Sequence, residues 1–301
     1  MAKTILVVLT GTGAHQADHY QLLQEEAARN EGAAGGVSVE IVFAPGFDHL
    51  RVIRGRLADP SAPKLDAVVV EPASVVATEL VLKEVKGRAG LVLLNAWSPA
   101  VDEHARNWGS GLPFGTVSTD HAGIGTIQGR QIRARLPGGG RVLCVTGPLR
   151  SSAAAQRLET AKAAVGADVT LLETEAGEWM ESDGIVAFDN WYSLNKAGDV
   201  TLGAIAAHSD ELAMGARSAC GAVINAAHRA MLAKVPVLGV DACPDYGRQL
   251  VDSGRLAASI TAPPNTGEAI RALRRFWDTG SPLDLRRLTT AEPDPTTSVR
   301  R

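Results

Sequence analysis

The sequence alternates about ten short apolar runs with helical patterns over most of its length. The runs are continuous rather than alternating in polarity, which is typical of parallel strands that helices cover on both faces. Strands that alternate with helices indicate an α/β fold, and ten strands favour two parallel sheets of about five over a single sheet. The expected strands are Thr4–Leu9, Val37–Phe43, Ala67–Val70, Leu91–Leu94, Phe114–Ser118, Arg141–Thr146, Asp168–Glu173, Gly203–Ala207, Val235–Val240 and Leu256–Ile260.

The clearest helical pattern runs from Thr266 to Trp277. Ile270 and Leu273 fall three residues apart, and Trp277 follows one turn later, so they form one apolar stripe. Three arginines are expected on the solvent side of this helix: Arg271, Arg274 and Arg275. The polar tail after about Thr289 contains two prolines and is expected to fray.

Size and charge exclude several classes of protein. The chain has 301 residues, of which 45% are hydrophobic and 21% charged, and its net charge is -3. It is therefore long enough for two globular domains. No block rich in Lys and Arg occurs, so nucleic acid is not expected as a direct partner. No stretch of about 18 apolar residues occurs, so no membrane insertion is expected.

The first apolar run is too short for a secretory signal, and no cleavage site follows it. As written, the chain is expected in the cytoplasm, or in the periplasm or outside the cell if a signal peptide has been removed. The three cysteines, Cys144, Cys220 and Cys243, are far apart and form no CxxC pair. Neither a disulfide framework nor a metal site is therefore signalled, and no cofactor is expected.

The run from Val235 to Ile260, VPVLGVDACPDYGRQLVDSGRLAASI, carries the strongest functional signal. An apolar strand ends in Asp241, and a short loop, a helix from about Asp245 and a second apolar strand follow. A carboxylate at the carboxyl end of a parallel strand lies where open α/β sheets bind their ligands. The alternative is an aspartate that caps a helix in an ordinary βαβ unit.

Four further segments share the pattern of one known family. They are LDAVVVEPAS (Leu65–Ser74), LVLLNAWS (Leu91–Ser98), SSAAAQRLETA (Ser151–Ala161) and AAHSDELAMGA (Ala206–Ala216). With the run that contains Asp241, they resemble the corresponding segments of type I periplasmic sugar-binding proteins, in the order and spacing of that family. The effector domain of the lactose-repressor family is similar to the same segments.

The resemblance implies a type I periplasmic-binding-protein fold, in which two Rossmann-like lobes with parallel sheets are joined by a three-strand hinge. It implies an N-terminal lobe of residues 1–119 plus 263–289 and a C-terminal lobe of residues 120–262 plus 290–301. The lobes are thus expected to be discontinuous in sequence, with a ligand cleft between them that closes on binding.

The resemblance also implies ligand contacts. Asp241 matches the aspartate that binds ring hydroxyls, and Arg157 matches an arginine whose fixed donors suit adjacent oxygens. Trp179 matches an aromatic that stacks on the sugar ring. Asn95 matches a position at which the family usually has aspartate, and Tyr20 matches the aromatic of the first loop. The full expected ligand-binding set is Asp18, His19, Tyr20, Asn95, Trp97, Arg157, Trp179, Ser209 and Asp241.

Several positions depart from the family pattern. Ala96 stands where the family has arginine, and Trp97 is expected to fill the space. Ser209 stands where the family has asparagine, and Ala262 where it has glutamine. Several of the groups that contact hydroxyls in the family are thus smaller or absent in this chain. This argues against ribose itself and permits a ligand that is larger, less polar or free of phosphate.

The sequence gives weaker support to dinucleotide binding, metal ligation and a catalytic triad. Gly11-Thr12-Gly13 lacks the third glycine of a dinucleotide fingerprint. His15, Asp18 and His19 could ligate a metal ion, but a polar loop before a helix is favoured. No GxSxG segment occurs to support a catalytic triad beside Asp120 and His121.

The sequence therefore predicts a non-enzymatic protein that binds a small polyhydroxylated molecule, such as a sugar or polyol. The family implies that it is the substrate-binding component of an ABC-type transport or sensing system, with an ABC permease or a sensor kinase as partner. The alternative is a cytoplasmic effector-binding domain of a lactose-repressor-like regulator that lacks its DNA-binding segment.

Overall fold

The computed structural model of the chain describes residues 2–11, 18–45, 48–96, 99–109 and 111–293. It divides into two compact units, each built from two stretches of sequence. Unit 1 consists of Met1–Thr119 and Pro264–Thr289, and unit 2 of Asp120–Pro263 and Thr290–Arg301. The chain therefore passes from one unit to the other three times, at residues 119–120, 263–264 and 289–290.

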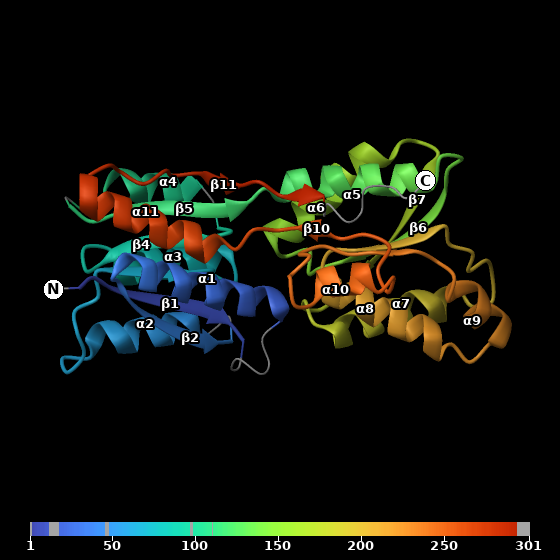
Figure 1. Cartoon of the computed structure of the whole chain (residues 1–301), viewed down its shortest axis with the longest axis horizontal. Coiled ribbons are helices and arrows are strands. Elements are labelled where there is room, and N and C mark those ends of the chain that lie inside the picture. The colour runs from blue at the N-terminus through green and yellow to red at the C-terminus, as the bar shows by residue number, and fades with distance from the viewer. Residues whose placement is uncertain (1, 12–17, 46–47, 97–98, 110, 294–301) are drawn as a thin grey trace. The chain divides into compact units, whose positions relative to one another are not determined.

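Unit 1 is a parallel sheet with helices on both faces (Figure 1). Its elements are β1 (Thr4–Thr10), α1 (His19–Gly35), β2 (Ser38–Ala44), α2 (His49–Ala58), β3 (Ala67–Val70), α3 (Val75–Val85), β4 (Gly90–Leu94), α4 (Pro99–Arg106), β5 (Phe114–Thr119), α11 (Asn265–Thr279) and β11 (Arg287–Thr289). The six strands are ordered β11-β5-β4-β3-β1-β2, and every neighbouring pair is parallel.

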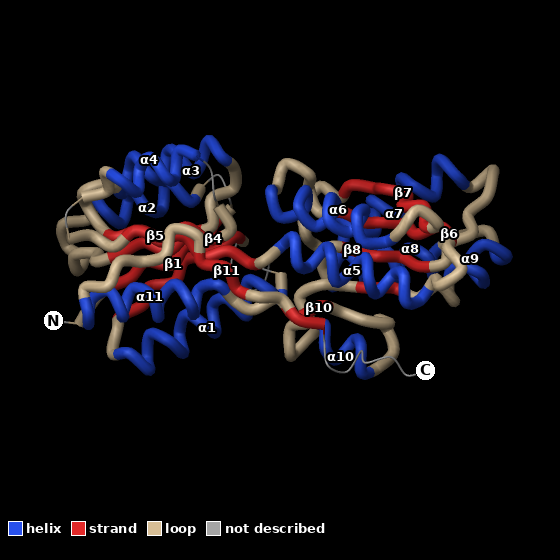
Figure 2. Tube along the Cα trace, turned by 90° about the horizontal axis from the view of Figure 1, so that it is seen from above, coloured by secondary structure: helices blue, strands red, loops and turns tan. Residues whose placement is uncertain are grey.

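Successive residues of the strands in unit 1 enter two different cores. Leu6 and Val8 belong to a core with α2, α3 and α4, whereas Ile5 and Val7 belong to a core with α1 and α11. Figure 2 shows these two sets of helices on opposite sides of the sheet. Burial on both faces explains why the strand sequences are continuously apolar, as parallel sheets require.

Helix α11 confirms the amphipathic pattern expected for Thr266–Trp277. Ile270 and Leu273 are fully buried against the sheet, and Trp277 packs at the edge of the same core. The helix ends at Gly280, whose φ of 73° is the left-handed conformation that glycine adopts without strain.

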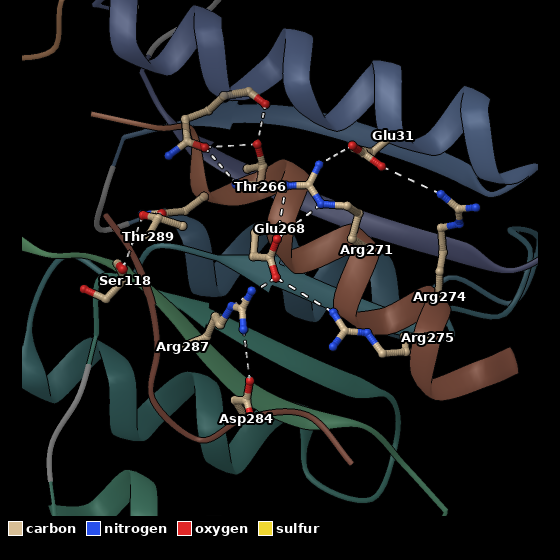
Figure 3. Close-up of polar contacts among 12 residues, drawn as sticks. Glu31, Ser118, Thr266, Glu268, Arg271, Arg274, Arg275, Asp284, Arg287 and Thr289 are labelled. Carbon is tan, nitrogen blue, oxygen red and sulfur yellow. Dashed lines mark hydrogen bonds and ion pairs between the residues drawn. The ribbon is translucent and has the colours of Figure 1, made fainter. Parts of the chain in front are cut away.

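The polar side of α11 carries a network of ion pairs (Figure 3). Glu268 lies 3.1 Å from a guanidinium nitrogen of Arg271 and 3.2 Å from one of Arg287. Arg271 also pairs with Glu31 of α1. The pairs with Arg287 and Glu31 tie α11 to β11 and α1, although such exposed pairs contribute no more than about 1 kcal/mol each.

Unit 2 has a four-stranded parallel sheet and a two-stranded antiparallel ribbon. Its elements are α5 (His121–Arg135), β6 (Gly140–Thr146), α6 (Ser152–Val165), β7 (Val169–Glu175), α7 (Glu181–Asn195), β8 (Ala204–Ala207), α8 (Asp210–Ala222), α9 (Ala226–Leu232), β9 (Val237–Leu238), α10 (Gly247–Asp252), β10 (Ile260–Thr261) and β12 (Glu292–Pro293). The sheet is ordered β7-β6-β8-β9, and β10 pairs with β12. Leu143 and Val145 face the core that contains α7 and α8, while Val142 faces α5 and α6.

The strand expected at Leu256–Ile260 was wrong in extent. Only Ile260 and Thr261 form β10, and Ala258 makes a single bridge to Leu238. The neighbouring β9 is also shorter than expected, because the backbone leaves the strand conformation after Leu238 and reaches positive φ at Asp241. With so short a partner, no long ladder can form.

The prediction that the C-terminal tail frays after about Thr289 is also wrong for residues 291–293. Ala291 is buried, and Glu292–Pro293 form β12 against β10. β12 thus covers one edge of β10, whose backbone polar groups would otherwise lack a strand partner there. β11, which the sequence did not predict, forms the edge of the sheet in unit 1 and pairs with β5 through its three residues. Residues 294–301 lie outside the described part of the chain.

Candidate functional site

The carboxyl end of β4 holds an ordered polar network centred on Asn95. Its amide oxygen accepts hydrogen bonds from the backbone N–H of Thr119 and the side-chain amide of Asn265, both at 3.0 Å. The Ser118 hydroxyl donates to the same oxygen at 3.3 Å. In turn, the amide nitrogen of Asn95 donates to Glu71 at 3.1 Å. Asn95 therefore joins the ends of three neighbouring segments of unit 1.

The start of α1 carries the predicted site residues of the first loop. Asp18 caps the helix, because its carboxylate accepts the backbone N–H of Gln21 at 2.7 Å. The Tyr20 hydroxyl lies 3.4 Å from the hydroxyl of Thr119. Tyr20 and Asn95 thus share Thr119 as a partner, and the structure brings these two predicted residues to one end of the sheet. His19 is half-buried in the first turn of α1. Trp97 and His15 lie outside the described residues.

Three residues other than glycine, among those described, have positive φ: Asn95 at 49°, Asp241 at 103° and Ala242 at 44°. All three follow the carboxyl end of a strand. Such conformations cost about 1–3 kcal/mol each and persist where the surrounding structure imposes them, often at ligand-binding positions. Two of the three were predicted as ligand contacts from the sequence. The surrounding structure therefore holds Asn95 and Asp241 in conformations that are often found at ligand-binding positions.

In unit 2, the structure brings Arg157 and Trp179 together. The guanidinium carbon of Arg157 lies 5.6 Å from the centre of the Trp179 ring, within the range of a cation–π contact. Arg157 is buried and also donates to the backbone carbonyl of His208. The Trp179 ring packs against the backbone after β6, where a Cβ on Gly147 would lie 2.3 Å from the ring. Only glycine therefore allows the indole to lie there.

Trp179 is half-buried and contacts the core cluster of α7 and α8. Its ring therefore contributes to the packing of unit 2 as well as supporting Arg157. A residue that only stacked on a ligand would have no such contacts, so replacement of Trp179 is expected to disturb the packing of unit 2.

Two buried histidines beside Arg157 were not predicted as site residues. Burial, and secondarily the charge of Arg157, lowers the pKa of His208 to about 3. Burial also lowers the pKa of His121 well below its ordinary value. His208 accepts the backbone N–H of Gly147 through Nδ1 at 3.3 Å. Within the described residues, neither ring nitrogen of His121 has a hydrogen-bond partner. In the sequence, His121 lies in the segment DHA and His208 in the segment HSDE. The two are far apart in the chain, and no sequence pattern connects them.

The remaining predicted residues follow strands β8 and β9. The Ser209 hydroxyl accepts the backbone N–H of Leu212 at 3.1 Å and so caps α8. Asp241 is buried, and its backbone N–H donates to the carbonyl of Ile260 at 2.8 Å. Asp210, the first residue of α8, is fully buried near Asp241 and was not predicted as a site residue.

The described part of the chain contains no group of three or more His, Cys, Asp or Glu side chains arranged to hold a metal ion. All three cysteines are buried and free of disulfides, and burial raises the pKa of the Cys144 thiol to about 12. Among the described residues, no helix is sufficiently long and apolar to span a lipid bilayer.

One small cavity lies in unit 1, between β4, β5 and the segments around α11 and β11. Its volume is about 60 Å³, and its lining includes Val92, Leu283 and Arg287. Figure 3 shows Arg287 and Glu268, which also lines the cavity, held by ion pairs. Small-molecule sites occupy roughly 300–1,000 Å³. This cavity has room for ordered water but not for a sugar.

Comparison with known proteins relates this arrangement to one family. A model of the family described as Periplasmic binding protein domain matches residues 12–274. A curated protein of Rhizobium meliloti, named "Putative rhizopine-binding protein", is 29% identical over 192 residues. That match covers 61% of this chain and 56% of the relative, so the chain spans little more than half of the relative's length.

Solved structures resemble the whole chain. An ABC transporter solute-binding protein from Bacillus halodurans with bound myo-inositol has a TM-score of 0.75 and 20% identity, covering 97% of this chain and 93% of its own. A periplasmic solute-binding protein from Actinobacillus succinogenes with bound D-allose has a TM-score of 0.75 and 18% identity, covering 97% and 96%. At sequence identities of 20% and 18%, the likeness shows a shared fold and nothing further.

Proposed function

Because the chain belongs to the periplasmic binding protein domain family, we propose that it is a non-catalytic receptor for a small polyhydroxylated molecule, a sugar or a cyclitol. The observation that carries the proposal is the polar chemistry at the carboxyl ends of the strands. Asn95 orders that end of unit 1, while Asp241 and the Arg157–Trp179 pair occupy it in unit 2. In parallel α/β sheets this is the edge at which ligands bind.

The side chains supply the contacts that a polyol needs. A carboxylate such as Asp241 accepts hydrogen bonds from hydroxyl groups, and a guanidinium such as Arg157 donates to their oxygens. The indole of Trp179 offers an apolar face to the C–H face of a ring. We propose as ligand contacts Tyr20 and Asn95 of unit 1 and Arg157, Trp179 and Asp241 of unit 2.

Relatives suggest which ligands to test first. The similar structures contain myo-inositol and D-allose, which are compact rings with many hydroxyl groups. Both are solute-binding proteins of ABC transporters, so we propose an ABC permease as the downstream partner of this chain, with a sensor kinase as the second possibility. The regulator-like alternative is less favoured, because the family match is to a periplasmic binding protein domain.

A thermal-shift screen tests the proposal. The panel comprises myo-inositol, D-allose, other hexoses and pentoses, and acyclic polyols. A ligand present at 100 times its Kd stabilises the folded state by about 2.7 kcal/mol, which is readily visible as a higher Tm. The proposal predicts concentration-dependent stabilisation by at least one member. Uniform Tm values across the panel at millimolar concentrations would contradict it.

Asp241→Asn is expected to weaken binding of the ligand that this screen identifies by about 10- to 100-fold. Hydrogen bonds to a charged group contribute about 1.5–3 kcal/mol, and 1.4 kcal/mol corresponds to tenfold in affinity. Asparagine tolerates positive φ, so the backbone at 103° should persist. Isothermal titration calorimetry measures the change.

The matched control is Asp245→Asn, which removes a carboxylate from an exposed position of the same loop. Its affinity should equal that of the unmodified protein. Equal affinities for Asp241→Asn and Asp245→Asn would show that the Asp241 carboxylate does not contact the ligand.

A further inference from the structure

Asp210 occupies a buried pocket built by three segments of unit 2. Its carboxylate accepts the Ser259 hydroxyl at 2.7 Å and the backbone N–H of Ala242 at 2.8 Å. A Cβ on Gly239 would lie 2.0 Å from one carboxylate oxygen, and a Cβ on Gly247 would lie 1.8 Å from the other. The backbone on both sides of the Asp241 turn therefore closes directly on this side chain, and glycine is required at both places.

The hydrogen bond to Ala242 reaches the backbone where it is strained. Asp241 and Ala242 have φ of 103° and 44°, which residues with a Cβ rarely adopt. The N–H of Asp241 is held by Ile260, and its carbonyl accepts the N–H of Ala262 at 3.3 Å. Asp210 is thus the side chain that fixes the second strained residue, from the first turn of α8.

Asp210 lies where a carboxylate can serve as a fixed hydrogen-bond acceptor. Ser209 caps α8, so Asp210 lies at the positive end of the helix, where a carboxylate is favoured. Burial, and secondarily the charge of Asp241, nevertheless raises the pKa of Asp210 well above its ordinary value. Glu211 acts in the same direction, whereas the hydrogen bonds from Ser259 and Ala242 oppose it.

We propose that Asp210 is a positioning residue: by holding the Ala242 N–H, it imposes the strained turn that presents the Asp241 carboxylate to ligand. The expected loss of ligand affinity rests on the proposed function, whereas the expected change in the backbone at Ala242 does not. An acceptor oxygen is required at residue 210, and a negative charge is not. Asparagine meets that requirement, since its oxygen can accept from Ala242 while its amide donates to the Ser259 hydroxyl.

The test compares Asp210→Ala with Asp210→Asn in the full chain. Hydrogen exchange of the Ala242 amide reads the backbone directly and needs no ligand. We expect the exchange rate to rise at least tenfold in Asp210→Ala and to stay within about threefold of the unmodified protein in Asp210→Asn. Affinity for myo-inositol, by calorimetry, should fall at least tenfold in the first variant and remain within threefold in the second. Unchanged exchange at Leu143 in β6 controls for loss of the fold.

Two results would overturn the inference. One is unchanged protection of Ala242 in Asp210→Ala, and the other is an equal loss of protection in both variants. If Asp210→Ala does not fold, Asp210→Ser replaces it, because its hydroxyl is too short to reach Ala242 from the same pocket. If the unmodified protein binds neither myo-inositol nor any other polyol tested, the proposed function fails. The exchange at Ala242 then still decides whether Asp210 holds the turn.

Discussion

Replacing Asn95 with alanine is expected to lower the free energy of unfolding of unit 1 by at least about 3 kcal/mol. The substitution removes the acceptor shared by the Thr119 N–H and the Asn265 amide, and both residues are buried. Each donor left without a partner costs about 1–3 kcal/mol. Alanine also tolerates a φ of 49° less well than asparagine, which adds about 1 kcal/mol. Urea denaturation followed by circular dichroism measures the loss.

Ser118→Ala is the matched control for Asn95. It removes only the weakest of the three donors to the Asn95 oxygen, at 3.3 Å, and leaves the other two in place. Its expected cost is below about 1 kcal/mol. If Asn95→Ala and Ser118→Ala destabilise unit 1 equally, Asn95 does not organise the end of its sheet.

Acid is expected to destabilise unit 2 through His208. Its pKa is lowered to about 3 in the folded state, so the unfolded state, with an ordinary pKa near 6.5, binds the proton first. Stability from this group is complete above about pH 6.5 and is lost as the pH falls toward 3. At pH 5 the loss is about 2 kcal/mol for His208 alone. His121 acts in the same direction because its pKa is also lowered.

His208→Asn isolates this effect. The asparagine oxygen can accept the Gly147 N–H in place of Nδ1, but it does not titrate in this range. Hydrogen exchange of amides in β6 and β8 at pH 7 and pH 5 gives the free energy of opening of unit 2. The variant should lose about 2 kcal/mol less than the unmodified protein between these pH values. Equal losses would show that His208 is already accessible to protons in the folded state.

The sequence predicted the parallel α/β architecture because burial on both faces leaves a direct mark, the continuous apolar runs at β1, β3 and β4. It also predicted α11 from the spacing of Ile270 and Leu273. It missed β11 and β12, whose two or three residues carry no periodic pattern and depend on pairing with β5 and β10. The family resemblance stated from the five segments is confirmed by the family match over residues 12–274.

A candidate site could be proposed from the sequence where a polar residue follows an apolar run, as at Asn95 and Asp241. It was not predictable where the role depends on tertiary contacts. Asp210 stands beside Ser209 in the same segment, yet only the structure shows that Ser209 caps α8 while Asp210 reaches Ala242. His121 and His208 come from distant segments and become neighbours of Arg157 only in the folded unit. The ligand contacts themselves remain predictions.

The most direct test of the receptor proposal is isothermal titration calorimetry of the purified chain with myo-inositol, D-allose and the rest of the polyol panel. The proposal predicts saturable binding of one ligand per chain, with a Kd of about micromolar or tighter, near −8 kcal/mol. It also predicts that the ligand recovered afterwards is chemically unchanged. Absence of saturable heat for every member of the panel, or conversion of the bound molecule to a product, would contradict the assignment of this protein as a non-catalytic polyol receptor.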